Sequence, residues 1–400
     1  MTWRKQVGAV VAAAVLAAGC SSTGSTAGHG PSAAGQAAGH GVEAPLGSVP
    51  WSLVGPGWLL ATSSPAAETA ATTLYLVDPA GGRYPITTFP SSNGQPPELV
   101  DWSRDGSRAL LKTGDTKAIL VELRTGKQTT ITVSGSPRFA RPDGKAILVS
   151  SGGDGNGPAT LKRVDPAGKQ QLTYPTDKLG SSFNGRYLTT PDGAQLVLGT
   201  DNGMVLVSND GVVGRRLPSP MPGAACSPVR WWTPTVILAS CTVHPADPYT
   251  TSAVPTQLWQ VPLDGATPTA LTAVNPGDGS DPAWGGDFAD SDGWQLPSGT
   301  YLQSSRSCGP RFLSRLTPDK HTTAVTVPGV DGHPTGGAGV IGVDGTALDL
   351  LAVTTPGCTG RDRQSLLLRY DPAANTSTVL LGPSVNSGTV LSAQSYPGQG

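Results

Sequence analysis

Charged residues are scarce in this chain, and neither sign of charge is in large excess. Asp, Glu, Lys and Arg make up 14% of the 400 residues, against about 25% in an average soluble domain. The formal net charge is −1. A protein without a basic excess has no electrostatic field to hold a phosphate backbone. The sequence therefore argues against nucleic-acid binding.

The motifs of several common active sites are also missing. The chain contains no G-x-S-x-G, no H-E-x-x-H and no P-loop, which argues against a hydrolase nucleophile, a zinc-protease site and a nucleotide-phosphate cradle. The G-x-G-x-x-G at residues 337–342 is followed by Asp-Gly and an apolar strand instead of a helix, so it is better explained as a close-packed inner strand. Asp287, Asp290 and Asp292 can offer oxygens to calcium, but their spacing fits no EF-hand and Asp/Gly runs favour turns. We predict no cofactor and no metal.

Long apolar runs are absent except near the N-terminus. Residues 7–18 form an apolar run that follows Arg4 and Lys5 and is too short to span a bilayer. It ends in Leu-Ala-Ala-Gly before Cys20, the only cysteine among the first 225 residues. A positive start and a short apolar run describe a secretory signal. The small residues before the cysteine resemble the lipobox of bacterial lipoproteins.

The lipobox resemblance implies cleavage before Cys20 and a lipid on its sulfur, with residues 1–19 as the signal peptide. The alternative is an ordinary secretory signal with an incidental cysteine. Residues 20–49 contain mostly Ser, Gly, Ala, Thr, Pro and His, and are predicted to form a flexible linker. We expect an extracytoplasmic protein that reaches the membrane through the lipid on Cys20 alone.

Turn-forming residues, in contrast, are abundant. The 53 Gly and 37 Pro are too many for a helical protein and indicate many short strands. The stretch DWSRDGSRALL at residues 101–111 reads as a strand, an Asp-Gly turn and an apolar strand, and related stretches recur at 136–150, 186–200 and 339–353. Asp-Gly supplies the positive φ that a tight hairpin needs. Each stretch therefore predicts a hairpin.

A second strand–turn phrase occurs seven times. Its equivalent positions are Asp78, Arg124, Asp165, Asp210, Asp264, Thr317 and Asp371. Spacings of 41 to 54 residues, with two hairpins per unit, are typical of the four-stranded blades of a β-propeller. We predict an all-β fold with a single propeller over residues 50–397 and seven blades, with six or eight as alternatives. Residues 389–397 are expected to close the ring by pairing with blade one near residues 51–60.

The pattern aromatic-Ser-x-Asp-Gly followed by an apolar strand, clearest in residues 99–200, resembles the TolB-type propeller repeat. Six blades are usual in that family, so seven repeats are a departure. The resemblance implies a protein-interaction or assembly module of the cell envelope, with an envelope protein as its partner. We predict a monomer without catalytic residues. Two alternatives stay open: a propeller enzyme of the streptogramin-lyase or sugar-cleaving type, and a small-ligand-binding receptor.

Four cysteines lie in the predicted propeller, and an exported protein is expected to keep them as disulfides. Four cysteines allow three connectivities. Cys226 and Cys241 lie symmetrically about an apparent turn at Thr233-Pro234, whereas Cys308 and Cys358 each follow the second strand of adjacent blades. We predict the pairs Cys226–Cys241 and Cys308–Cys358.

The predicted binding site lies in the loops after the second strands of blades five to seven, which are longer than those of the other blades. These loops contain His244, Asp247, Tyr249, Arg306, Arg311, Arg361, Asp362 and Arg363. Guanidinium groups suit bidentate contacts with carboxylates. The arginines are therefore expected to bind a partner protein, with simple solvation of the loops as the alternative.

Overall fold

A computed structural model describes most of the chain from residue 41 onward. The described residues are 41–65, 71–90, 96–152, 158–243, 255–274, 291–305, 311–330, 337–353, 364–386 and 388–397. The chain divides into two compact units, residues 1–33 and 34–400, and all described residues belong to the second. Within these ranges, no helix combines the length and the apolarity that crossing a membrane requires.

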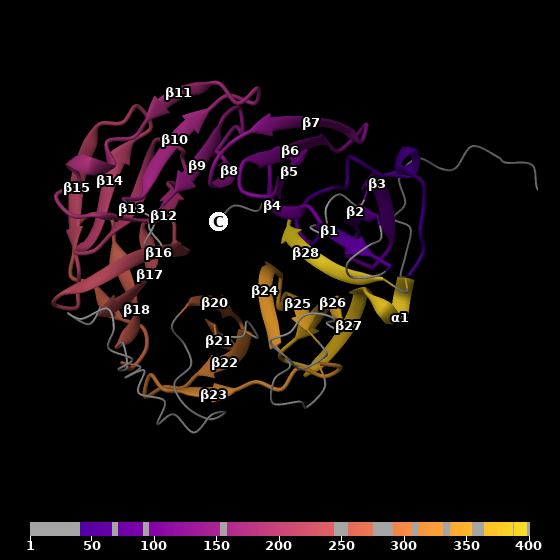
Figure 1. Ribbon diagram of the computed structural model, residues 1–400. Helices are drawn as coiled ribbons and strands as arrows, with labels where there is room; N and C mark the ends of the chain where they lie inside the picture. Colours follow the sequence, from indigo (N-terminus) through magenta and orange to yellow (C-terminus); the bar gives the residue numbers. More distant parts are fainter. Residues whose placement is uncertain are drawn as a thin grey trace, which may run out of the picture. The chain divides into compact units, whose positions relative to one another are not determined.

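The second unit consists of antiparallel sheets that follow one another around a ring (Figure 1). The first sheet contains β28 (Thr389–Ser395), β1 (Leu59–Ser64), β2 (Thr72–Val77) and β3 (Arg83–Phe89). The second contains β4 (Glu98–Trp102), β5 (Arg108–Thr113), β6 (Lys117–Glu122) and β7 (Lys127–Thr132). The third contains β8 (Ser136–Phe139), β9 (Ile147–Ser151), β10 (Thr160–Val164) and β11 (Gln170–Thr173).

Two more four-stranded sheets lie in the C-terminal part of the chain. One contains β20 (Asp292–Leu296), β21 (Gly299–Ser305), β22 (Arg311–Leu316) and β23 (Thr322–Ala324). The other contains β24 (Gly337–Asp344), β25 (Ala347–Val353), β26 (Ser365–Asp371) and β27 (Thr376–Leu381). The described helices are short: η1 (Leu46–Ser48), η2 (Thr176–Lys178) and α1 (Pro383–Asn386).

An eight-stranded sheet occupies the middle of the sequence. Its first half contains β12 (Phe183–Thr189), β13 (Gln195–Thr200), β14 (Gly203–Ser208) and β15 (Val213–Pro218). Its second half contains β16 (Ala224–Thr233), β17 (Val236–Val243), β18 (Thr256–Pro262) and β19 (Thr269–Ala270). β13 and β16 join the halves through the pair Thr200 and Cys226. The all-β propeller is confirmed, whereas the number of seven blades requires this sheet to be counted as two and stays a prediction.

The stretch DWSRDGSRALL forms the hairpin of β4 and β5. Gly106 has a φ of +71°, which is the left-handed conformation that glycine adopts without steric cost. The side chain of Ser103 donates to Asp105 at 2.7 Å, and the backbone N–H of Arg108 donates to the Ser103 hydroxyl at 2.8 Å. The Asp-Gly phrase therefore marks hairpin turns, as the sequence predicted.

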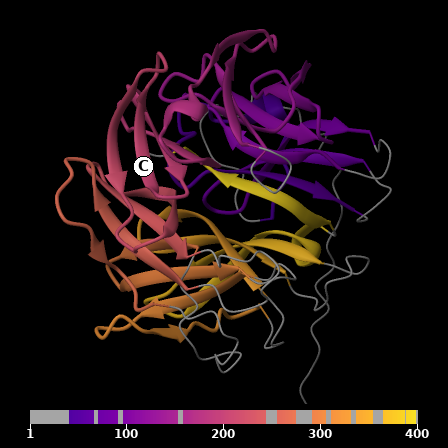
Figure 2. The same cartoon turned by 60° about the vertical axis from the view of Figure 1, so that its left-hand side comes forward.

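The C-terminal strand closes the ring. β28 pairs with β1 in an antiparallel register that runs from Leu59 opposite Ser395 to Ser64 opposite Thr389. Both views show β28, in yellow, beside the indigo strands of the first sheet (Figure 1, Figure 2). The predicted closure by residues 389–397 is confirmed. With β28 the first sheet has four strands, and the edge of β1 is not left unpaired.

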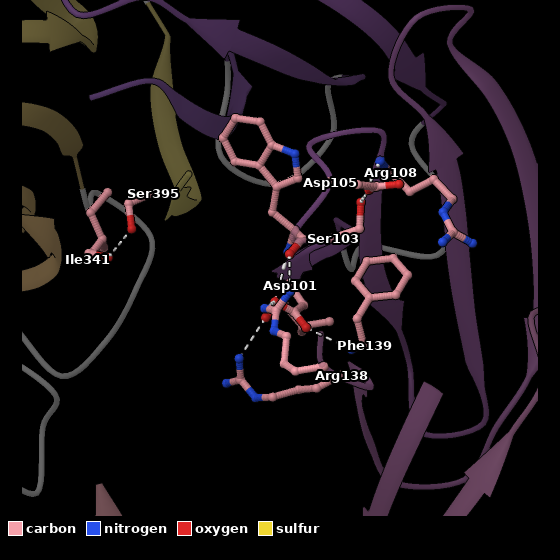
Figure 3. Close-up of polar contacts among 11 residues, drawn as sticks. Asp101, Ser103, Asp105, Arg108, Arg138, Phe139, Ile341 and Ser395 are labelled. Carbon is pink, nitrogen blue, oxygen red and sulfur yellow. Dashed lines mark hydrogen bonds and ion pairs between the residues drawn. The ribbon is translucent and has the colours of Figure 1, made fainter. Parts of the chain in front are cut away.

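The G-x-G-x-x-G stretch forms part of β24. A Cβ atom added at Gly342 would lie closer to the Cβ atom of Ser395 on β28 than two carbon atoms can approach. The hydroxyl of Ser395 donates to the carbonyl of Ile341 at 2.9 Å (Figure 3). Glycine is required here because two strands meet closely, which confirms a close-packed inner strand.

The hydrophobic core consists of layers between neighbouring sheets. The layer between the first and second sheets includes Trp58, Leu60, Leu99 and Trp102. Other layers follow around the ring in the same way. Each sheet thus buries both of its faces, so the strands need apolar residues on both sides.

The part of the chain that packs on the first sheet starts before the predicted boundary at residue 50. The backbone N–H of Gly41 donates to the carbonyl of Gly81, and that of Ala44 donates to the carbonyl of Arg83. Val49 is 6% exposed. Residues 41–49, assigned to the linker from the sequence, therefore contact the propeller. Their few apolar side chains suffice because they fill an edge of an existing core.

The first predicted disulfide is present. Cys226 on β16 lies directly opposite Cys241 on β17, and their sulfurs are bonded. Both residues are fully buried. The symmetry of the two cysteines about the turn in the sequence was a sufficient signal. Cys308 and Cys358 lie outside the described residues, and their pairing stays a prediction.

Removal of this disulfide is expected to lower the free energy of unfolding by about 3 kcal/mol, because the bond closes a loop of 15 residues. The variant Cys226→Ala/Cys241→Ala, compared with the oxidised protein by urea unfolding, measures the effect. The reduced unsubstituted protein is the control for the packing of the two sulfur atoms, which the substitution removes. Equal unfolding free energies in all three samples would contradict the prediction.

Candidate functional site

Most residues predicted from the sequence for binding lie outside the described residues. This holds for the lipidation site Cys20 and for the loop residues His244, Asp247, Tyr249, Arg306, Arg361, Asp362 and Arg363. Arg311 is the first residue of β22, and its backbone lies opposite Ser305. The structure therefore does not bring these residues together, and their roles stay predictions.

The innermost strands of the ring are sorted by the sign of their charges (Figure 1). Three consecutive ones, β8, β12 and β16, carry Arg138, Arg186 and Arg230. Acidic residues lie on β4, β20 and β24, namely Glu98, Asp101, Asp292 and Asp344. The charge balance along the sequence gives a different division: residues 98–218, which include Glu98 and Asp101, have a net charge of +4, and residues 219–397, which include Arg230, have a net charge of −5. Among the described residues, the excess of positive charge therefore lies in 98–218.

Asp101 and Arg141 form a buried link between the second and third sheets. Arg141 Nη2 donates to Asp101 Oδ1 at 2.6 Å, and the backbone N–H of Phe139 donates to Oδ2 at 2.7 Å. The N–H of Trp102 also donates to Oδ1, at 2.9 Å. Asp101 is 4% exposed. Its charge is therefore neutralised inside the protein and is not available to a ligand.

A second charged pair links β16 to β20. The Nε and Nη2 atoms of Arg230 donate to the two carboxylate oxygens of Asp292, which is a bidentate contact. The guanidinium also lies 4.3 Å from the centre of the Trp294 ring. Asp292 is thus engaged by an arginine. Among the residues that the structure describes, no three His, Cys, Asp or Glu side chains are grouped to hold a metal ion.

A third charged group joins the last sheet to the first through Arg369 on β26. Its Nε donates to Asp349 at 2.9 Å, and Nη1 lies 2.9 Å from Asp344. The same guanidinium donates to the carbonyls of Gly57 and Pro79, each at 3.0 Å. Burial raises the pKa of the Asp349 carboxyl, and the hydrogen bond and charge of Arg369 lower it. Burial has the larger effect, so the pKa is raised. This group holds the ring together.

Two arginines of the innermost strands have no carboxylate partner. Arg138 is exposed, and its Nη1 donates to the carbonyl of Val100 at 2.9 Å. Arg186 is exposed, and its side chain forms no hydrogen bond or ion pair within the described ranges. In Figure 3 the Arg138 guanidinium points toward the side of the view on which Ile341 and Ser395 lie. Among the described inner-strand arginines, Arg138 and Arg186 are the two with unused binding capacity.

Tyr187 adds a buried hydroxyl to this region. Its oxygen is buried and has no hydrogen-bond partner among the described residues. Burial raises the pKa of Tyr187; the charges of Arg138 and Arg141 lower it, and that of Asp101 raises it. The phenol therefore lies within electrostatic reach of these groups and is a neutral donor at physiological pH. A buried hydroxyl without a partner costs about 1–3 kcal/mol.

The sequence contains a signal for these arginines. Each inner-strand arginine directly precedes an aromatic residue, in Arg138-Phe139, Arg186-Tyr187 and Arg230-Trp231. Neighbouring side chains of a strand point to opposite faces. The three aromatic residues pack in or against the layers between sheets, so the arginines point away from those layers.

Comparison with known proteins shows similarity in fold only. No family model and no curated protein matches it. TolB from Acinetobacter baumannii matches with 16% identity over 67% of this chain and 64% of that chain, at a TM-score of 0.38. The chain therefore spans less than two thirds of the length of that TolB. BamB from Moraxella catarrhalis matches with 12% identity over 83% of this chain and 93% of that chain, at a TM-score of 0.39. An oligogalacturonate lyase in complex with manganese matches with 14% identity over 80% of this chain and 83% of that chain, at a TM-score of 0.43.

The arrangement of its sheets makes this chain a β-propeller protein. TolB is among the propellers to which it is similar. The identities are low, and the likeness concerns the fold.

Proposed function

We propose that the protein is a membrane-anchored, extracytoplasmic propeller that binds another protein of the cell envelope. The observation that carries the proposal is that Arg138 and Arg186 on the innermost strands have no carboxylate partner. Strands of a closed ring hold the backbones of these residues in fixed positions, and binding residues are commonly carried by a rigid scaffold. The signal-like N-terminus and the lipobox-like Cys20 support a location at the membrane.

The state of the described carboxylates also favours binding over catalysis. Asp101, Asp292 and Asp349 are each engaged by an arginine. A general acid or base must be free to exchange a proton with a substrate. Asp101 and Asp292 instead connect neighbouring sheets, and Asp349 holds Arg369, which itself bonds the carbonyls of Gly57 and Pro79.

The loops after the second strands of blades five to seven extend the proposed site. Their arginines, Arg306, Arg311, Arg361 and Arg363, add four positive charges within residues 219–397. In this proposal they contact a second part of the same partner.

In-cell crosslinking tests the proposal. The tagged full-length chain is crosslinked in its own host, extracted, and analysed by mass spectrometry, beside a variant with Arg306, Arg311, Arg361 and Arg363 replaced by Ala. A control variant loses the same number of charges from outer strands and turns, at Lys117, Lys127, Lys169 and Arg215, all exposed. We expect one envelope protein with the unsubstituted chain and the control, and at least about tenfold less with the loop variant.

Two results would contradict the proposal. One is that no envelope protein is enriched by the unsubstituted chain. The other is that the loop variant and the control lose the partner equally, since this would show a general effect of charge instead of a site. The first result would redirect attention to enzymatic and small-ligand functions.

A further inference from the structure

We infer that Arg138 and Arg186 bind the carboxylates of an acidic peptide segment in the partner protein. The inference depends on the proposed function, because it names the chemistry of one contact with that partner. It follows from the charge balance of the innermost strands, from the way the two arginines are held, and from the distribution of charge along the chain.

The charge balance leaves an excess of guanidinium groups on β8 and β12. The carboxylate of Asp101 is used by Arg141, and that of Asp292 is used by Arg230. Glu98 on β4 is exposed, but it forms no ion pair with Arg138 or with Arg186 in the described structure. Positive charge that the protein does not neutralise attracts a negative ligand.

The backbone that carries Arg186 is held in place by hydrogen bonds from three strands. The hydroxyl of Ser150 donates to the carbonyl of Gly185 at 2.9 Å, and the N–H of Arg186 donates to Asn184 Oδ1 at 3.1 Å. Asn184 Nδ2 in turn donates to the carbonyl of Cys226 at 3.1 Å. The residue is thus positioned without any use of its guanidinium. The backbone is thus fixed, and the guanidinium keeps all of its N–H groups for a ligand.

Arg138 is held in a similar way. Its neighbours Pro137 and Phe139 lie opposite Val149 and Ile147 in the β8–β9 ladder. The contact of one Nη atom with the carbonyl of Val100 orients the side chain and leaves other N–H groups of the fork for a ligand. A planar fork of donors matches the two oxygens of a carboxylate.

The distribution of charge along the chain favours a short acidic segment over an extended polyanion. Among the residues that the structure describes, those of 98–218 carry an excess of positive charge, whereas the acids and bases of 219–397 nearly balance. An extended nucleic acid or an anionic membrane surface would also meet the half that has no positive excess to attract it. A short acidic peptide contacts the positive half alone.

Fluorescence anisotropy tests the inference. The probe is a short fluorescein-labelled peptide of Asp, Glu, Gly and Ser, and its control is the same peptide with Asn and Gln in place of the acids. The full-length chain in detergent is compared with Arg138→Gln/Arg186→Gln and with a matched control, Lys127→Gln/Arg215→Gln, whose substitutions lie on the exposed outer strands β7 and β15. Thermal unfolding of each variant verifies that it is folded.

The acidic peptide is expected to bind at low salt and to bind at least about tenfold more weakly to Arg138→Gln/Arg186→Gln. The matched control is expected to stay within about twofold of the unsubstituted chain. Equal weakening in both variants, no binding of the acidic peptide, or tighter binding of phosphatidylglycerol vesicles would overturn the inference. If the crosslinked envelope partner is still captured by Arg138→Gln/Arg186→Gln, the proposed function stands and this inference alone fails.

Discussion

Replacement of Arg369 by methionine is expected to lower the free energy of unfolding by about 3–5 kcal/mol. The substitution leaves the carboxylate of Asp349, 1% exposed, buried without its arginine. It also removes the hydrogen bonds to the carbonyls of Gly57 and Pro79, which join the last sheet to the first. Equilibrium unfolding in urea, followed by tryptophan fluorescence, measures the loss.

The control for this prediction is Arg215→Met on the outer strand β15, where the side chain is exposed. Its effect is expected to stay within about 0.5 kcal/mol. The double variant Arg369→Met/Asp349→Asn is expected to recover part of the loss, because the amide carries no charge. A loss in Arg215→Met as large as that in Arg369→Met would contradict the assigned role.

The loss in Arg369→Met is also expected to depend on pH. The pKa of Asp349 is raised in the folded protein, chiefly by burial. For such a group the contribution to stability is present below the unfolded pKa and is lost as the pH rises through the folded pKa. Without Arg369, the ionised Asp349 carboxylate destabilises the folded protein even more, because its favourable charge partner is gone. The loss of unfolding free energy in Arg369→Met is therefore expected to be smaller at about pH 4, close to the pKa of an unfolded aspartate, than at neutral pH. An equal loss at both pH values would contradict this prediction.

Replacement of Asp101 by alanine is expected to be similarly severe, at about 3–5 kcal/mol. Arg141 would lose its partner, and the N–H groups of Phe139 and Trp102 would lose their acceptor. Buried donors that lose their acceptors keep the full cost of desolvation. Urea unfolding gives the measurement here as well.

Asp115→Ala is the matched control for Asp101→Ala. The side chain of Asp115 is 99% exposed and lies 3.9 Å from Lys112, so its loss is expected to change the free energy of unfolding by less than about 0.5 kcal/mol. Asp101→Asn keeps one oxygen acceptor and is expected to fall between the two. Equal stabilities of Asp101→Ala and Asp115→Ala would show that the buried link contributes nothing.

The repeats in the sequence predicted the local structure well because hairpins depend on short-range chemistry. Asp105 and Gly106 form a turn whatever lies beyond it, and residues two apart on each strand share a face. The disulfide of Cys226 and Cys241 follows from the same hairpin geometry. The pairing of residues 389–397 with the first sheet was also predictable, since the segment remains after the last repeat.

The boundary of the folded part was less predictable from the sequence. Residues 41–49 are poor in large apolar side chains, as a linker is, yet Val49 is buried and Gly41 and Ala44 bond to the first sheet. Composition reports whether a segment can form a core of its own. It does not report whether the segment can complete a core formed by others.

By itself the sequence determined the class of fold, the hairpins, one disulfide and the strand that closes the ring, because each of these follows from spacing along the chain. Only the tertiary structure decided which charges are neutralised. Asp101 meets Arg141 across 40 residues, and Arg230 meets Asp292 across 62, and no spacing rule links such pairs. Arg138 and Arg186 are candidates for binding because Asp101 and Asp292 on neighbouring inner strands form ion pairs with other arginines.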